Sequence, residues 1–295
     1  MTPPFLPLPM LGRLYDSVPQ FLQPLQFRMT RTLDELTASA SLVYREYAAR
    51  RYVVLSSTQM KLSIYHALPT TTTCVAWHRR AGVLATATVI EDSPLGLPMD
   101  DVYKTELDLK RRHDRRLAEV GFLAVDSRLF GTGVFSMANS KKLLLVLRLL
   151  KVLADFVRST GRIEELVACF HPKHELLFDF LGMKPLGPVK AYSGANGAPV
   201  VARCLDLAQT ARETAAHPAH RFFFGRKPAA RATRTLRLSP TDLRRLFVLD
   251  SSVFASASPT ELAYLKSCYP SYDFGQILDG LPSALPSRNP TANSL

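Results

Sequence analysis

One acidic residue in an otherwise apolar segment is the strongest candidate for chemistry in this sequence. Glu119 lies inside the run LAEVGFLAV (117–125), whose apolar content predicts a buried strand. An ionised carboxylate is costly to bury without a partner, so such an acid usually faces a cavity or a specific partner. A carboxylate at a cavity can take the proton that an amine must lose before it attacks a thioester. A structural ion pair with a nearby arginine explains the residue equally well.

A short glycine-containing segment after this strand is the second candidate. It reads RLFGTG (128–133), begins at Arg128 and has its glycines at Gly131 and Gly133. Glycines between a strand and a helix let backbone N–H groups approach a phosphate, which the helix dipole also favours. A simple turn is nevertheless the commoner meaning of so short a motif. Lys141 and Lys142, on the helix that follows, are suited to an acidic partner or to simple solvation.

Arginine, histidine and cysteine residues offer weaker candidates. Arg45 lies among aromatic residues in LVYREYAARRY (42–52), where it is suited to bind a substrate carboxylate or to pair with a surface acid. His171 and His174 have a spacing that metal ligands can use, but no third ligand is evident, so we predict a helix start and no metal site. The four cysteines form no C-x-x-C pair, which fits a reducing cytoplasm. No G-x-S-x-G, P-loop lysine or dinucleotide motif is present.

The elements that must position these residues alternate between strand and helix. Helical periodicity covers 31–51, and two β-branched runs predict a hairpin over 70–90. The segment 101–117 is strongly charged, and we expect it to be exposed. The strand at 117–125 precedes an apolar helix (143–157), a strand (166–170), a short helix (174–181) and two strands around an Asn-Gly turn at 196–197. This order predicts an α/β (α+β) domain with a mixed sheet.

Composition divides the chain into four expected parts: an N-terminal arm (1–30), an α/β domain (31–209), a basic, helical extension (210–280) and a disordered tail (281–295). The net charge of +12 favours an acidic partner, such as nucleic acid, an anionic membrane, a phosphorylated cofactor or an acidic protein. The proline-broken start is no secretory signal. The longest apolar run is interrupted by Arg148 and Lys151, and a spanning helix needs about 20 apolar residues, so no membrane span is predicted.

Two blocks of the sequence resemble the long-chain N-acyl amino acid synthases. The first is VLATATVIEDSPLGLPMDDVY (83–103) with RRLAEVGFLAV (115–125), which is also similar to the acyl-homoserine-lactone synthases. The second is HPKHELLFDFLGMKPLGPVKAYSGANGAPVVARCLDL (171–207). The resemblance covers roughly residues 31–207. It implies the GNAT (N-acetyltransferase-like) fold, a mixed twisted sheet flanked by helices with a V-shaped opening between two central strands.

The resemblance also implies a reaction. A long fatty acyl chain would pass from the phosphopantetheine arm of acyl carrier protein, or from acyl-CoA as the alternative donor, to the amino group of a free amino acid. No metal, nucleotide or bound cofactor would be needed, and the acidic carrier would suit the basic surface. Glu119 matches the acid that opens the lactone-synthase motif E-L-S-R-F, but Phe122 and Thr88 stand at that family's arginine positions, which disfavours lactone-precursor synthesis. Phe178 stands where many GNAT acetyltransferases have a proton-donating tyrosine; a thiol of pKa about 8.5 needs little such help.

The implied mechanism is direct transfer without an acyl-enzyme. Glu119 would orient or deprotonate the amine, and Arg45 would bind the acceptor carboxylate. Backbone N–H groups of the strand at Phe122, Leu123 and Ala124 would polarise the thioester carbonyl. The donor phosphate or carrier would contact Arg128, Gly131, Gly133, Lys141 and Lys142. An apolar tunnel for the acyl chain would be lined by Leu123, Val146 and Phe178, for which ordinary core positions are the simpler interpretation.

The extension and the alternatives complete these predictions. Aromatic and basic residues at 221–227 (RFFFGRK) are expected to cover the tunnel mouth or to rest on the inner membrane, as a peripheral contact of a cytoplasmic protein. The alternatives are a CoA-dependent GNAT N-acetyltransferase and a non-catalytic basic module that binds membrane or nucleic acid. Nucleic acid is disfavoured as a partner because the basic residues follow no recognisable nucleic-acid motif.

Overall fold

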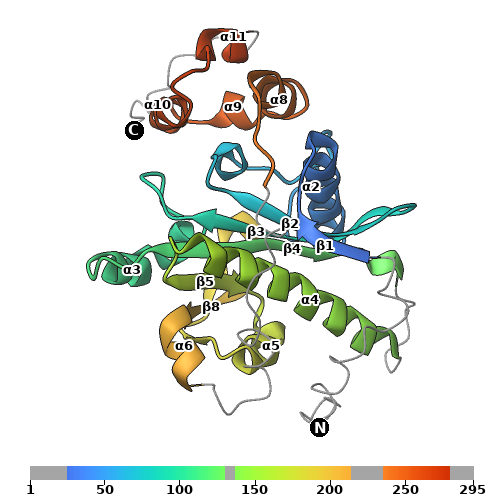
Figure 1. The fold of residues 1–295 in the computed structure, drawn as a ribbon, viewed down its shortest axis with the longest axis vertical. Coiled ribbons are helices and arrows are strands. Elements are labelled where there is room, and N and C mark those ends of the chain that lie inside the picture. Colours follow the sequence, from blue (N-terminus) through green and yellow to red (C-terminus); the bar gives the residue numbers. More distant parts are fainter. Residues whose placement is uncertain (1–24, 130–136, 214–234, 280–295) are drawn as a thin grey trace, which may run out of the picture.

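One mixed sheet organises the chain in the computed structural model, which describes residues 25–129, 137–213 and 235–279 (Figure 1). The strands are β1 (Leu25–Met29), β2 (Thr72–His78), β3 (Gly82–Glu91), β4 (Leu117–Val125), β5 (Glu165–Phe170), β6 (Lys184–Pro185), β7 (Lys190–Tyr192) and β8 (Ala198–Asp206). Their order in the sheet is β1-β2-β3-β4-β5-β8-β6, and β7 pairs with β8. All pairs are antiparallel except β4 with β5, which are parallel.

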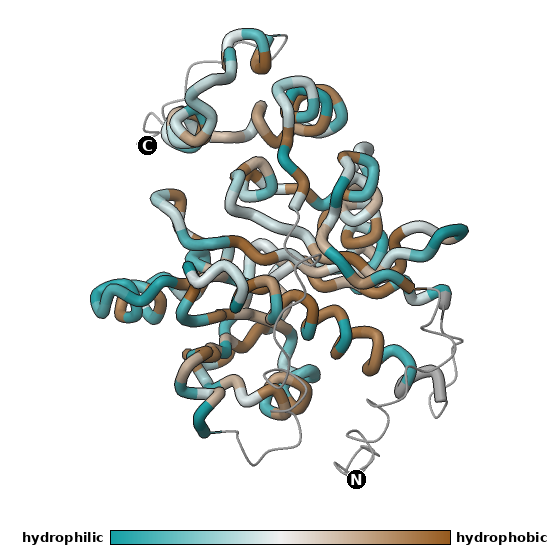
Figure 2. Tube along the Cα trace, viewed as in Figure 1, coloured by the Kyte–Doolittle hydropathy of each residue, from teal (hydrophilic) through white to brown (hydrophobic). Residues whose placement is uncertain are grey.

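Helices cover both faces of this sheet. They are α2 (Leu33–Ala48), α3 (Asp100–Arg111), α4 (Met137–Thr160), α5 (Glu175–Phe180) and α6 (Leu207–Glu213), with short turns η2 (Ile64–Ala67), η3 (Ser127–Leu129), η4 (Pro172–His174) and η5 (Ser193–Ala195). Helices α4 and α5 pack on one face, and α2 and α3 pack on the other. Hydrophobic residues concentrate on the central strands and on α4, whereas α3 is largely hydrophilic (Figure 2). The predicted mixed sheet flanked by helices is thus confirmed.

Local sequence explains where these elements begin. The side chain of Thr32 accepts a hydrogen bond from the Glu35 N–H and caps α2, because a hydroxyl satisfies one of the free donors of a first turn. The β2–β3 hairpin turns at Gly82, whose φ of +73° suits glycine. In α3, Tyr103 and Leu107 are fully buried although charged residues surround them, so the segment expected to be exposed is instead an amphipathic helix.

A separate cluster of short helices follows the sheet domain. This C-terminal helical unit (235–279) comprises α8 (Pro240–Arg244), the π-helical turn η7 (Arg245–Leu249), α9 (Val253–Ser256), α10 (Pro259–Cys268) and α11 (Phe274–Leu278). It lies beyond α2 at one end of the molecule (Figure 1). Its apolar core includes Leu36 of α2 and Ile64, Ala67 and Leu68 around η2. The Tyr269 hydroxyl donates to the buried carbonyl of Ala67 at 2.7 Å, which fixes the unit to the segment before β2.

One predicted boundary is wrong, and two predicted segments lie outside the described residues. Residues 25–29 were assigned to the N-terminal arm, but they form β1, which pairs with β2 along its whole length. The sheet therefore begins before residue 31, since an edge strand of mixed composition gives little periodicity to recognise. The basic aromatic segment 221–227 and the tail 281–295 lie outside the described residues. No helix among the described residues is both long and apolar enough to cross a membrane.

Candidate active site

The central feature of the site is the divergence of β4 from β5. The two strands pair over Leu117–Glu119 and Glu165–Val167, and within the described strands no later pairing joins them. The edges of both strands beyond these residues line a cavity of about 790 Å³, called the main cavity below. This volume lies in the range of about 300–1,000 Å³ that is usual for small-molecule sites. The opening predicted between two central strands is therefore present, and Glu119 lies at its closed end.

A β-bulge in β4 shapes the wall of the main cavity. Thr86 of β3 pairs with Ala124 and Thr88 pairs with Gly121, so two residues of β4 face one residue of β3. Phe122, the first of the two, has a φ of +52°, a conformation that is strained for a bulky residue. The bulge interrupts the alternation of faces, and the Phe122 ring contacts His66 at a centroid distance of 4.5 Å. The backbone edge of Phe122, Leu123 and Ala124 lines the cavity and is covered by no described strand.

Glu119 is buried and unpaired in charge. Only 4 % of its surface is exposed, and its Oε2 atom accepts a hydrogen bond from the Met99 N–H at 2.8 Å. Burial raises the pKa of Glu119 to about 8, with a smaller contribution from the negative charges of Asp100 and Asp101 and an opposing one from the Met99 N–H. No ion pair to Glu119 occurs among the described residues, so the structural ion pair with an arginine is not found. A carboxyl of this pKa is suited to exchange protons near neutral pH.

The three residues predicted to line an acyl tunnel share one wall of the main cavity. Leu123, Val146 and Phe178 all contribute to its lining, and they come from β4, α4 and α5. The Phe178 ring stacks on Phe170 of β5 with centroids 3.7 Å apart and an interplanar angle of 12°. Leu150 of α4 extends the same wall. The α4–α5 side of the cavity is therefore apolar, as an alkyl chain requires.

Basic side chains gather where β4 and β5 end. Arg50, Lys142, His171 and His174 line the main cavity there, and Arg50 pairs with the carboxylate of Glu46 at 2.9 Å. Burial lowers the pKa of Lys142, and the positive charge of Arg50 lowers it further. Burial, and then the charge of Lys173 among other cations, lowers the pKa of His174 to about 4. This end of the cavity is suited to an anionic group.

Histidine, arginine and glycine candidates nearby have other positions. His171 caps the turn η4, because its Nδ1 accepts from the Lys173 N–H at 3.2 Å, as expected for a helix start.

Arg45 and Arg128 both pair with the buried carboxylate of Asp126, at 3.0 and 2.6 Å, and neither lines the main cavity. Lys141 does not line it either. The glycines of the predicted phosphate loop, Gly131 and Gly133, lie outside the described residues. No group of His, Cys, Asp and Glu suited to a metal occurs in the described chain.

Sequence reasoning missed the residues at the opposite end of the main cavity. The lining there includes Lys61 and Tyr65 before β2, Asp101 of α3 and Tyr192 of β7. The C-terminal helical unit adds Val253, Ser256, Ala257 and Glu261. These residues are distant in sequence, and each one by itself looks like an ordinary loop or helix residue. Tertiary packing brings them to one site, including that of the unit against η2 and that of β7 beside α3.

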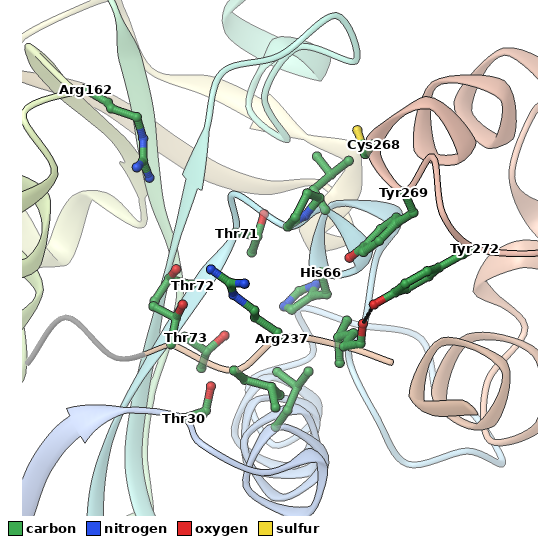
Figure 3. A pocket seen from close by; sticks show the side chains of 16 residues that line it. Thr30, His66, Thr71, Thr72, Thr73, Arg162, Arg237, Cys268, Tyr269 and Tyr272 are labelled. Atoms are coloured by element: carbon green, nitrogen blue, oxygen red, sulfur yellow. Dashed lines mark hydrogen bonds between the residues drawn. The ribbon is translucent and has the colours of Figure 1, made fainter. Parts of the chain in front are cut away.

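A second cavity, of about 380 Å³, lies between the ends of β1 and β2 and the C-terminal helical unit (Figure 3). Threonine side chains from 71–73 face Tyr269 and Tyr272 across it, with Arg237 between them. Its lining contains no carboxylate. Its histidine, His66, has a pKa lowered to about 4, mainly by burial. Among its described lining residues, the second cavity has no group whose pKa is matched to proton transfer from an amine near neutral pH.

Comparison with known proteins identifies the family of the chain. The family model described as N-acyl amino acid synthase FeeM matches residues 38–206, more than half of the chain. The solved structure of FeeM, an N-acyl amino acid synthase from uncultured soil microbes, is similar over 64 % of this chain and 93 % of its own, with 26 % identity and a TM-score of 0.52. The AHL synthase LasI (15 % identity, TM-score 0.48) covers 70 % of this chain and 96 % of its own. The CoA-dependent acyl-homoserine lactone synthase BjaI (15 %, 0.48) covers 73 % and 93 %. No curated protein matches the chain.

Proposed function

The chain belongs to the FeeM family of N-acyl amino acid synthases and is an acyltransferase, and on this basis we propose that it transfers a long-chain fatty acyl group from acyl carrier protein to the amino group of a free amino acid. The observation that carries the proposal is the position of Glu119, a buried carboxyl without a cation partner at the closed end of the opening between β4 and β5. An amine in this opening meets a proton acceptor beside an apolar wall of the main cavity.

Each step of the proposed reaction has a group suited to it. Glu119 takes a proton from the acceptor ammonium, and the neutral nitrogen attacks the thioester carbon. The N–C bond forms while backbone N–H groups of the bulged segment, at Phe122, Leu123 and Ala124, stabilise the developing oxyanion. The nitrogen then loses its second proton to water, the C–S bond breaks, and the leaving thiolate takes a proton from water to become a thiol. Glu119 returns its proton to solvent. Much of the rate would come from holding amine and thioester together in the opening.

The charge distribution supports a phosphopantetheine donor. A phosphate on the donor arm would meet Lys142 and Arg50 at the open end of β4 and β5, where Lys173 adds to the positive surroundings. The net charge of +12 favours association with an acidic carrier protein. Acyl-CoA carries the same phosphopantetheine group, so it is the alternative donor. The apolar wall at Leu123, Val146 and Phe178 is where we propose that the acyl chain lies.

Mass spectrometry of lipid extracts tests the reaction. Cells that express the chain should contain new species whose masses equal a fatty acid plus an amino acid minus water. These species should be absent with an empty vector and lost with Glu119→Ala. Unchanged products with Glu119→Ala would keep the reaction and reject the catalytic residue. A purified, folded protein that forms no acyl amino acid from either acyl carrier protein or acyl-CoA would refute the proposal, and the faster of the two donors identifies the natural one.

A further inference from the structure

Lys61 places a positive charge in the wall of the main cavity, and no described residue forms an ion pair with it. It lies just before η2, where its backbone N–H donates to the carbonyl of Ala40 at 3.1 Å. The side chain is partly buried and lines the cavity, and burial alone lowers the pKa of its ammonium group. No carboxylate of the described residues forms an ion pair with it. A partly buried ammonium without a counter-charge destabilises the free protein, so a ligand is the natural source of the missing charge.

Lys61 is distinct from the basic group at the open end. Arg50 is neutralised by Glu46, and the electrostatic neighbours of Lys142 are Arg50, Glu46 and Lys173. Lys61 instead acts on the pKa of His66, whose ring contacts Phe122 at the bulge. Lys61 also precedes η2, the turn that carries His66, and it lines the main cavity on that side.

We propose that Lys61 binds the carboxylate of the acceptor amino acid while Glu119 receives the proton of its amine. This inference rests on the proposed function and adds the rule by which the acceptor is chosen. An amino acid carries its ammonium and its carboxylate on one carbon, so a site at the bulge must bind both charged groups within a short distance of each other. An ammonium donor and a buried carboxyl in one cavity are complementary to such a zwitterion. The acceptor class is therefore a free α-amino acid, and simple amines or amino acid amides are poor substrates.

The C-terminal helical unit keeps Lys61 in place. Ile64, Ala67 and Leu68, which follow Lys61 in the chain, belong to the apolar core of the unit, and the Tyr269 hydroxyl donates to the Ala67 carbonyl. Residues of α9 and the turn after it, among them Val253, line the same cavity. The family match ends at residue 206, so this support for the acceptor end is added by a part of the chain outside the matched region.

A comparison of two acceptors tests the inference. Steady-state kinetics are measured with the preferred amino acid and with its carboxamide, which keeps the amine and lacks the negative charge. The wild-type protein should prefer the amino acid by about 10- to 100-fold in kcat/KM, the usual effect of one charge-assisted hydrogen bond. Lys61→Met should raise KM for the amino acid by a similar factor, leave kcat almost unchanged and leave the carboxamide unaffected. Lys61→Arg, which keeps the charge, should retain part of the preference.

Controls separate a binding role from a general one. Lys104→Met removes an exposed lysine of α3 and should leave both acceptors unchanged. Lys61→Met should raise the melting temperature because it removes a partly buried charge, and this rise shows that the variant is folded. An equal fall of kcat/KM for both acceptors, or an unchanged ratio between them, would overturn the inference while leaving the proposed function intact. A wild-type protein that acylates neither acceptor would overturn the proposed function and this inference together.

Discussion

Replacing Glu119 by glutamine separates the catalytic role of this carboxyl from its effect on stability. Glutamine keeps the shape and can still accept from the Met99 N–H, but it neither ionises nor takes a proton. Burial raises the pKa of Glu119 from 4.5 to about 8 in the folded protein. At about 1.4 kcal/mol for each pKa unit, the folded protein disfavours the ionised form by on the order of 5 kcal/mol. Glu119→Gln removes both the cost of ionising a buried carboxyl and the group that accepts the amine proton.

The sign of the effect on stability follows from the raised pKa. The folded protein binds the proton more tightly than the unfolded chain, so the stabilising contribution is full below pH 4.5 and is lost as the pH rises to about 8. Wild-type stability should therefore fall over this window relative to Glu119→Gln. The difference in free energy of unfolding should reach a few kcal/mol by pH 8 and change little above it. Denaturant titrations at pH 5, 6.5 and 8.5 measure this difference.

The activity of the wild-type protein should rise with pH over the same range in which its stability falls. For the wild-type protein, kcat/KM should rise about tenfold per pH unit below pH 8, because only the ionised carboxylate accepts the amine proton. Glu119→Gln should be slower by about 100-fold or more at pH 8 and should lack this limb of the profile. The variant depends on amine that is already deprotonated in solution, so its profile should follow the pKa of the amine, and a limb with an apparent pKa near 8 belongs to Glu119. A variant that keeps both the limb and the rate, or that is no more stable at pH 8.5, would refute the assignment.

Three further substitutions probe other parts of the site. Val146→Phe should shift the products toward shorter acyl chains in mass spectrometry, whereas Val152→Phe, on the same helix but outside the cavity lining, should not. Lys142→Met should raise KM for the acyl donor about tenfold without changing the ratio of amino acid to carboxamide acceptors; an unchanged donor KM would remove Lys142 from the donor site. Tyr269→Phe should lower the free energy of unfolding by about 1–3 kcal/mol in denaturant titrations, because the buried carbonyl of Ala67 loses its donor.

Elements with a strong local pattern were predictable from the sequence. The apolar run at 117–125 matches β4 to the residue, since charged residues and a turn bound it on both sides. The β-branched runs at 70–90 form the β2–β3 hairpin as predicted, because β-branched side chains favour strands. Helix α3 could not be predicted because Tyr103 and Leu107 form a narrow buried stripe among many charged residues. Two apolar residues are too few to show the helical spacing of a buried face.

Only the part of the site that lies on a single strand could be predicted from the sequence. Glu119 could be singled out because a carboxyl within an apolar strand breaks a local rule. Arg45 could not be assigned, since its partner Asp126 is distant in sequence and an arginine looks the same in sequence whether it binds a substrate or an internal acid. The bulge at Phe122 could not be predicted from the sequence either, because the residue with the positive φ is not a glycine. The contribution of Val253 to the cavity depends on packing across most of the chain.

Three locally unfavourable features meet in the main cavity. Among the described residues, Glu119 is a buried carboxyl with no paired cation and Lys61 is a partly buried ammonium with no paired anion. Phe122 has a backbone conformation that costs a bulky residue about 1–3 kcal/mol. A sequence that served only the fold would favour glutamine, methionine and glycine at these positions. The opposite charges do not pair with each other, although a shared cavity would permit compensation. Two charges held apart beside a strained backbone are what a zwitterion and a carbonyl group need in order to react, so a substrate accounts for all three features together.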